Sequence, residues 1–173
     1  TSFPLIDTSS ATTLEAAWYG CTGLTSFPLI NTAACTRFYQ AWRECSGLTS
    51  FPLIDTSAGT NFHQAWLNCT SLTSFPALNL LAGTVFTQAW QGCTALTAFP
   101  ANMFDTCLAT DFTSSFVNCA LNATSVNRIL TSIEQAGTSG GTLGMTGGTS
   151  SAPSAGGITA KNALIARGWT VTT

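Results

Sequence analysis

Charged side chains are scarce in this sequence. They make up 7% of its 173 residues, with five Lys and Arg against seven Asp and Glu, whereas about 25% of the residues of an average globular protein are charged. Nucleic-acid binding depends on many contacts between basic side chains and phosphates, and docking on anionic lipid depends on basic clusters. So few basic residues argue against both partners.

Long apolar runs are missing, and histidine occurs only once. The apolar stretches span a few residues each, whereas a membrane-spanning helix needs about 20. We therefore expect no membrane insertion. The single histidine, His63, is the only imidazole that could act as a general base, and an activated nucleophile needs a base that a further group orients. We predict that His63 lies on the surface and that the protein is not an enzyme.

Apolar residues and small hydroxyl residues fill the composition instead. Apolar residues make up 45% of the chain, which is ample for a core and argues against disorder. Thr and Ser account for 30 and 17 residues, so the polar surface is mainly neutral. A surface with so little charge does little to keep copies of a protein apart. This composition favours a protein that works inside an assembly.

A 24-residue repeat dominates the sequence. The motif Leu-Thr-Ser-Phe-Pro starts at Leu24, Leu48 and Leu72, and Leu-Thr-Ala-Phe-Pro starts at Leu96. The fourth copy carries two extra residues near Asn102. We predict a repeat array over residues 1–120 and a C-terminal cap over 121–173. The array begins in the middle of a copy, which indicates the C-terminal part of a longer polypeptide. Two columns keep the 24-residue step: Trp18, Trp42, Trp66 and Trp90, and Cys21, Cys45, Cys69 and Cys93.

Each copy is predicted to contain a short strand, a turn and a short helix. Phe38, Ala41, Trp42 and Cys45 have the i, i+3, i+4, i+7 spacing of one helix face. Strands stack about 4.8 Å apart and helices about 8–10 Å apart, so stacked copies should curve with their strands on the concave side. A threonine precedes each helical stripe and is predicted to be its N-cap, with Glu15 completing a capping box in the first copy; these threonines are Thr12, Thr36, Thr60, Thr84 and Thr110.

The predicted fold class is therefore α/β. The repeat length lies in the 20–29-residue range of leucine-rich repeats, and the expected architecture is a curved leucine-rich-repeat solenoid of about five 24-residue units with a C-terminal α/β capping segment. In the cap we expect a helix at 125–136 ended by Gly137, a strand at 143–145, a helix at 159–167 and a strand at 169–172. The apolar stripe of the first helix is Val126, Ile129, Leu130 and Ile133.

Two motifs carry a resemblance to a known family. Cys-x-x-Leu-Thr-Ser-Phe-Pro and Phe-x-x-Ala-Trp-x-x-Cys, with Phe104-Asp105-Thr106, resemble the BspA-type leucine-rich repeat family. The stretch from Gly147 to Thr172 resembles the ends of repeat proteins in bacteriophage tail fibres and bacterial surface proteins. These resemblances imply an extracellular location, on a virion or a bacterial cell, and a role in adhesion or host recognition without catalytic residues. Three central copies are two residues shorter than the family's repeats.

The cysteines and the acidic residues have structural explanations. Five cysteines follow the repeat, Cys119 with a delay of two residues, and are predicted to form a buried ladder of free thiols. Cys35 and Cys107 break the period, and a disulfide between them stays open. No short-spaced pair of metal ligands such as Cys-x-x-Cys occurs, so we expect neither metal nor cofactor. One row of Asx residues is predicted to cap turns, the alternative being a carboxylate pair for glycoside cleavage; it consists of Asp7, Asn31, Asp55 and Asn79.

Recognition by surface side chains remains as the predicted function. We expect a non-enzymatic extracellular module, on a phage fibre or virion surface, that binds a host-surface glycan or protein. The alternative is a structural virion or cell-surface protein that binds copies of itself or other virion proteins in a fibre or shell. A third possibility is ice binding by a regular threonine ladder. The candidate ligand face is the exposed row Thr25, Ser26, Thr49, Ser50, Thr73, Ser74 and Thr97.

Overall fold

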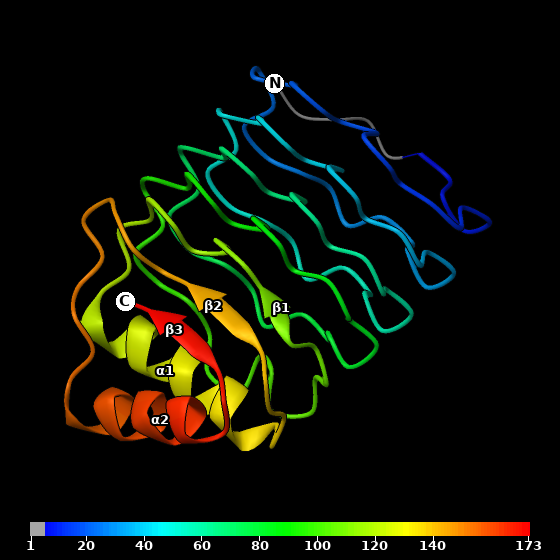
Figure 1. Cartoon of the computed structure of the whole chain (residues 1–173). Helices are drawn as coiled ribbons and strands as arrows, with labels where there is room; N and C mark the ends of the chain where they lie inside the picture. Colours follow the sequence, from blue (N-terminus) through cyan, green and yellow to red (C-terminus); the bar gives the residue numbers. More distant parts are fainter. Residues whose placement is uncertain (1–5) are drawn as a thin grey trace.

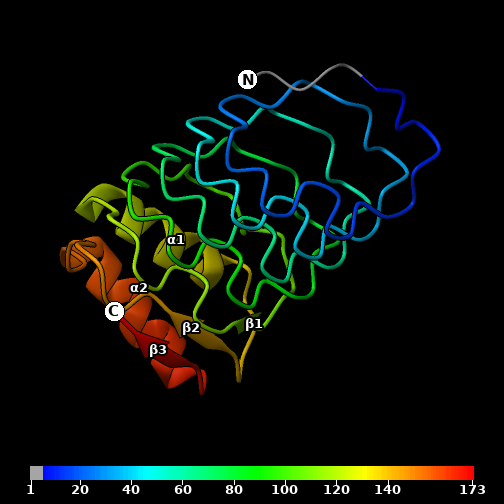
Figure 2. The same cartoon turned by 90° about the horizontal axis from the view of Figure 1, so that it is seen from above.

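Parallel pairing between successive copies of the repeat organises the molecule. The computed structural model describes residues 6–173, and residues 6–122 form a stack of coils (Figures 1 and 2). Isolated parallel bridges join Thr13 to Arg37, Arg37 to Asn61, Asn61 to Val85 and Val85 to Asp111. The regular elements lie at the C-terminal end of this stack: β1 (Asp111–Phe112), α1 (Ala123–Gln135), β2 (Thr142–Gly144), α2 (Ala155–Ala166) and β3 (Thr170–Thr172).

The row of bridges continues into a three-stranded parallel sheet of order β1-β2-β3. Asp111 pairs with Thr142, and Thr142 pairs with Thr170. One hydrogen-bonded ladder therefore runs from Thr13 in the first described coil to Thr170 in β3. The assignment of this stack to the leucine-rich repeats stays a prediction.

The helices predicted in the repeats are wrong: the described residues 6–122 contain none. Alternate N–H groups donate to the next coil instead, Phe38 to the Asn61 carbonyl at 2.9 Å and Gln40 to that of His63 at 3.0 Å. The N–H of Ala41, which lies between two such donors, turns back to the Phe38 carbonyl at 3.2 Å. Residues equivalent to Gln40 adopt positive φ in every coil, and this breaks a helix at each repeat.

The spacing of the coils explains why turns replace helices. The indole rings of Trp42 and Trp66 stack with centroids 5.5 Å apart, and those of Trp66 and Trp90 at 5.4 Å. Helices need about 8–10 Å between axes, so no helix fits in a stack held at this spacing. The residues of the predicted stripe are nevertheless buried: Phe38, Trp42 and Cys45 are fully inaccessible to solvent.

Neighbouring coils lie closer together on the side predicted to be helical than on the side of the Thr-Ser row. The prediction had the Thr-Ser row on the narrower, concave side. The rings of Phe38 and Phe62, on the side predicted to be helical, lie 5.2 Å apart. The rings of Phe27 and Phe51, beside the Thr-Ser row, lie 5.9 Å apart. The candidate Thr-Ser face therefore lies on the wider side of the stack, where we expected the narrower one.

The predicted N-cap threonines also serve the ladder. The Thr36 hydroxyl donates to the Thr12 carbonyl at 3.2 Å, and the Thr60 hydroxyl donates to the Thr36 carbonyl at 3.1 Å. The capping box is wrong as well, because the Glu15 carboxylate forms an ion pair of 3.0 Å with Arg37 in the next coil. Both corrections share one cause: with no helix to cap, these side chains link neighbouring coils.

The elements predicted after the repeats are confirmed. Both helices and both strands occur, although α2 begins at Ala155, four residues before the expected start. α1 buries its predicted stripe, and its Ser125 accepts from the Phe99 N–H at 2.9 Å and donates to the Thr97 carbonyl at 3.1 Å. β2 and the residues that follow it accept the last N–H groups of the coils, as in Phe116 to Gly144 at 2.9 Å. This end of the stack is thus closed.

Candidate functional site

The Asx row is a set of turns, as predicted. The Asp55 carboxylate accepts from the Ser57 N–H at 2.9 Å, and the Asn31 side chain accepts from the Ala33 N–H at 3.2 Å. The hydrogen bonds from Ser57 lower the pKa of Asp55 below its usual value. Each of these side chains therefore has a structural partner two residues further along the chain.

Four of the five cysteines predicted to form a buried thiol ladder do so, namely Cys45, Cys69, Cys93 and Cys119, whereas the prediction is wrong for Cys21, which is exposed. Cys45 donates to the Trp18 carbonyl at 3.1 Å, and Cys69 donates to the Trp42 carbonyl at 3.2 Å. All seven cysteines are free, and only Cys21 is exposed. Burial raises the pKa of Cys45 to about 12, which makes it a poor nucleophile at neutral pH.

Cys35 and Cys107, for which a disulfide was left open, are two separate buried thiols. Cys35 donates to the Arg37 carbonyl at 3.4 Å and Cys107 to the Gly83 carbonyl at 3.4 Å. Among residues 6–173, no three His, Cys, Asp or Glu side chains come together in a group that could hold a metal ion.

All seven residues of the candidate Thr-Ser face are exposed. The Thr49, Thr73 and Thr97 hydroxyls each donate to the threonine carbonyl of the preceding coil, at 3.2–3.3 Å. The hydroxyl proton of each of these threonines is therefore used in a hydrogen bond to the preceding coil. Their methyl groups and hydroxyl lone pairs face outward. This row is the same in nearly every coil, with the single change to Ala98.

A second face carries side chains that differ from coil to coil. We call it the ladder face; it comprises the outward side chains of residues 13–20, 37–44, 61–68, 85–92 and 111–118. The position of Glu15 is taken by Tyr39, His63 and Thr87 in later coils. The backbone hydrogen bonds behind these side chains repeat unchanged. The ladder face also holds most of the charged groups of the coils: Glu15, Arg37, Arg43, Glu44 and Asp111.

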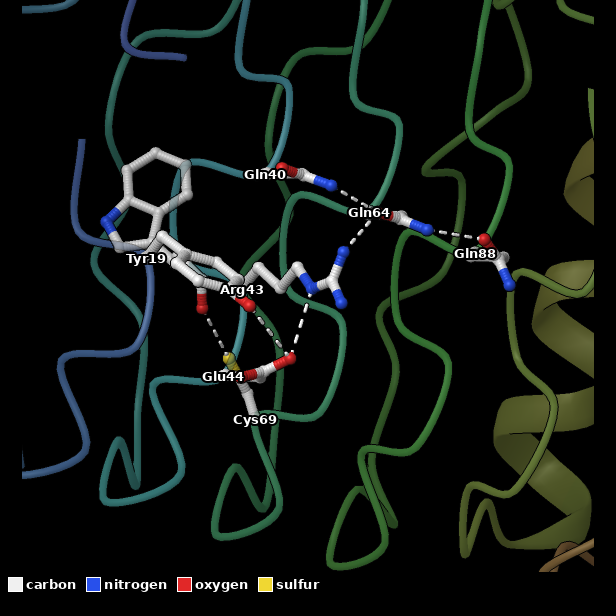
Figure 3. Close-up of polar contacts among 8 residues, drawn as sticks. Tyr19, Gln40, Arg43, Glu44, Gln64, Cys69 and Gln88 are labelled. Carbon is white, nitrogen blue, oxygen red and sulfur yellow. Dashed lines mark hydrogen bonds and ion pairs between the residues drawn. The ribbon is translucent and has the colours of Figure 1, made fainter. Parts of the chain in front are cut away.

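Glutamine amides cross the ladder face from coil to coil (Figure 3). Gln40 Nε2 donates to Gln64 Oε1 at 2.6 Å, and Gln64 Nε2 donates to Gln88 Oε1 at 2.6 Å. The same Gln64 oxygen accepts from Arg43 Nη1 at 2.9 Å. The amides thus form a continuous row that fixes the orientation of the arginine.

Arg43 is the centre of a small polar and aromatic cluster (Figure 3). Its Nε lies 3.2 Å from Glu44 Oε1, and its guanidinium carbon lies 5.2 Å from the centroid of the Tyr19 ring. The Tyr19 hydroxyl donates to the same Glu44 oxygen at 3.4 Å. Tyr19 keeps 47% of its surface exposed. The cluster therefore presents an aromatic ring and an oriented guanidinium side by side at the surface.

His63 lies on the same face but is half-buried rather than fully exposed. Its ring stacks on that of Tyr39, with centroids 5.3 Å apart and an interplanar angle of 18°. Burial is the main cause that lowers the pKa of His63, and it outweighs the opposing effect of the Asp111 carboxylate. A neutral imidazole at pH 7 can both donate and accept a hydrogen bond.

Sequence reasoning missed the ladder face as a candidate site because it placed these residues on the outside of helices. A usable signal was present. Between otherwise similar copies, the side chains at the positions of Glu15 and Tyr19 change most in size, charge and aromatic character.

No helix among residues 6–173 is long and apolar enough to span a bilayer. Comparison with protein-family models, curated proteins and solved structures finds no match to this chain.

Proposed function

We propose that the protein is a non-enzymatic extracellular recognition module, carried on a phage fibre or virion surface, that binds a host-surface glycan or protein through the ladder face. One observation carries the proposal: a constant hydrogen-bonded backbone displays a set of side chains that changes from coil to coil. A scaffold of this kind separates stability from recognition, because side chains can vary while the ladder stays intact.

The chemistry of the ladder face suits a polar ligand. Arg43 and Arg37 each have a carboxylate partner at 3.2 and 3.0 Å, so the face offers oriented donors with little net charge. Tyr19 and the stacked pair of Tyr39 and His63 add amphipathic rings, which contribute large contact areas at low entropic cost. Sugar hydroxyls and the polar groups of a protein loop both match this combination.

The Thr-Ser face is the competing site for the same function. Its regular hydroxyl rows suit a repetitive ligand, and its side chains carry no charge. The two faces can be separated with paired variants. Arg43→Ala with His63→Ala alters the ladder face, and Thr49→Ala with Ser50→Ala alters the Thr-Ser face in a neighbouring part of the stack.

Adsorption to a panel of bacteria and binding to a glycan array would test the proposal. We expect the wild type and the Thr49/Ser50 variant to bind equally, and the Arg43/His63 variant to lose at least about tenfold in affinity, as expected when charged hydrogen bonds are lost. Circular dichroism should first show that both variants fold. Equal binding by both variants, or loss only in the Thr49/Ser50 variant, would contradict the proposed face.

A structural role is the second candidate, and exposed apolar residues favour it. Leu29 and Leu53 occupy the same position in adjacent coils and keep 65% and 63% of their surface exposed. With so few charges to oppose contact, such a row could join copies side by side. Sedimentation equilibrium at rising concentration tests this role, and a protein that stays monomeric at high concentration would argue against it.

A further inference from the structure

A hollow of about 250 Å³ lies where α1 meets the last coil. One wall is the segment at Asn102, where the fourth copy holds its two extra residues. The opposite wall is the outer side of α1, with Thr124, Asn127, Arg128 and Thr131. The hollow shares no residue with the ladder face, so what it binds is a separate question from the proposed function.

Arg128 differs from the other arginines of residues 6–173. Arg37, Arg43 and Arg167 each lie 3.0–3.2 Å from a carboxylate, whereas Arg128 has no carboxylate partner among the described residues. One of its amino groups, Nη1, donates to the Phe99 carbonyl at 3.3 Å. This bond orients the guanidinium at the hollow and leaves its other N–H groups available for a ligand.

The remaining lining side chains are neutral, and all of them except Ala101 are polar. Thr124 and Thr131 flank Arg128 on the same side of α1, one helical turn away in each direction, and neither hydroxyl has a hydrogen bond within the described part of the chain. Asn102 closes the hollow from a backbone position with φ +59°. The carboxylate beside the hollow, Asp105, is engaged by the Ser132 hydroxyl at 2.6 Å.

We propose that this hollow binds a single sugar acid, with its carboxylate on the Arg128 guanidinium and its hydroxyls on Thr124, Thr131 and Asn102. The planar fork of arginine matches a carboxylate through two parallel hydrogen bonds. The volume lies below the roughly 300–1,000 Å³ of pockets for larger ligands, which suits one monosaccharide ring. Short hydroxyl and amide side chains around a single cation provide the neutral hydrogen bonds that such a ring requires.

Titration calorimetry with D-glucuronate, D-glucose and inorganic sulfate tests the proposal on the wild-type protein. Glucuronate should bind, while glucose, which lacks the carboxylate, and sulfate, which lacks the ring, should bind at least about tenfold more weakly. Sulfate binding as tight as glucuronate binding would overturn the sugar-acid assignment. An absence of glucuronate binding would overturn it too.

Two variants and a control locate the site. Arg128→Gln removes the positive charge but keeps a polar side chain, and should weaken glucuronate binding by about tenfold or more. Thr131→Val keeps Arg128 in place and should weaken it by a smaller factor. Lys161→Gln removes one positive charge from α2, outside the hollow, and should leave binding unchanged. Equal affinity in Arg128→Gln and the wild type, or equal loss in Lys161→Gln, would refute the site.

Discussion

Truncation of Trp66 to alanine should destabilise the centre of the coil stack more than any surface change. Its indole is fully buried and stacks between those of Trp42 and Trp90 at 5.5 and 5.4 Å. Phe51 and Phe75 approach it at steep angles, with centroids 5.4 and 4.8 Å away. The truncation therefore opens a cavity that neighbouring coils, fixed by their ladders, cannot close.

The expected loss is large for a single substitution. Changes of Phe or Trp to Ala in a core cost about 3–5 kcal/mol. For a domain of 150–250 residues, each kcal/mol lowers the melting temperature by about 2–4 °C. We therefore expect Trp66→Ala to lower it by roughly 6–20 °C.

Calorimetry or circular dichroism would measure this effect against two controls. Leu53→Ala, at a side chain 63% exposed, should change stability by no more than about 0.5 kcal/mol. Trp66→Phe should cost less than Trp66→Ala, because it keeps an aromatic ring and gives up an indole N–H that has no partner. Equal and small changes for Trp66→Ala and Leu53→Ala would refute a buried tryptophan column.

Three further predictions concern the thiols and the close approach of coils. An alkylating reagent should label Cys21 alone in the native protein, because the other six thiols are buried; labelling at several sites would contradict the thiol ladder. Folding keeps Cys45 protonated with a pKa of about 12, so its contribution to stability is complete below the unfolded pKa of about 8.5 and is lost as the pH rises towards 12. The free energy of unfolding should therefore fall above about pH 8.5, and fall less in Cys45→Ala. Gly47→Ala should lower the melting temperature, since the added Cβ would lie 2.4 Å from the Thr22 carbonyl oxygen, whereas Gly23→Ala meets nothing within 4 Å and should not.

The sequence predicted which residues are buried better than it predicted the backbone that buries them. The spacing of Phe38, Ala41 and Trp42 correctly marked an inward stripe, because both a helix and a chain of tight turns return side chains to one side at short intervals. Local spacing cannot tell these backbones apart. The distance between coils decides whether the backbone forms a helix or a chain of turns. That distance depends on aromatic stacking between residues 24 positions apart.

The cap was predicted more accurately because its signals are local. α1 has a stripe of apolar residues, an Asn122 side chain that accepts from the Ser125 N–H at 2.9 Å, and Gly137 with φ +75° just beyond its end. Each signal acts within a few residues. The hollow at Arg128 could not be predicted in this way, because it forms between α1 and the inserted segment at Asn102.

The ladder gives the molecule a modular length. Because Thr13, Arg37, Asn61 and Val85 occupy equivalent places in one row, a block of 24 residues could be gained or lost and the flanking coils would still meet in register. A shift of one residue would instead move the tryptophan of that coil out of the indole stack and its N–H groups out of register with the carbonyls of the next coil. The two extra residues of the fourth copy lie near Asn102, outside this row, and Val85 still pairs with Asp111 across them. The turn at Asn102 is therefore a place where a loop can change its length without disturbing the ladder.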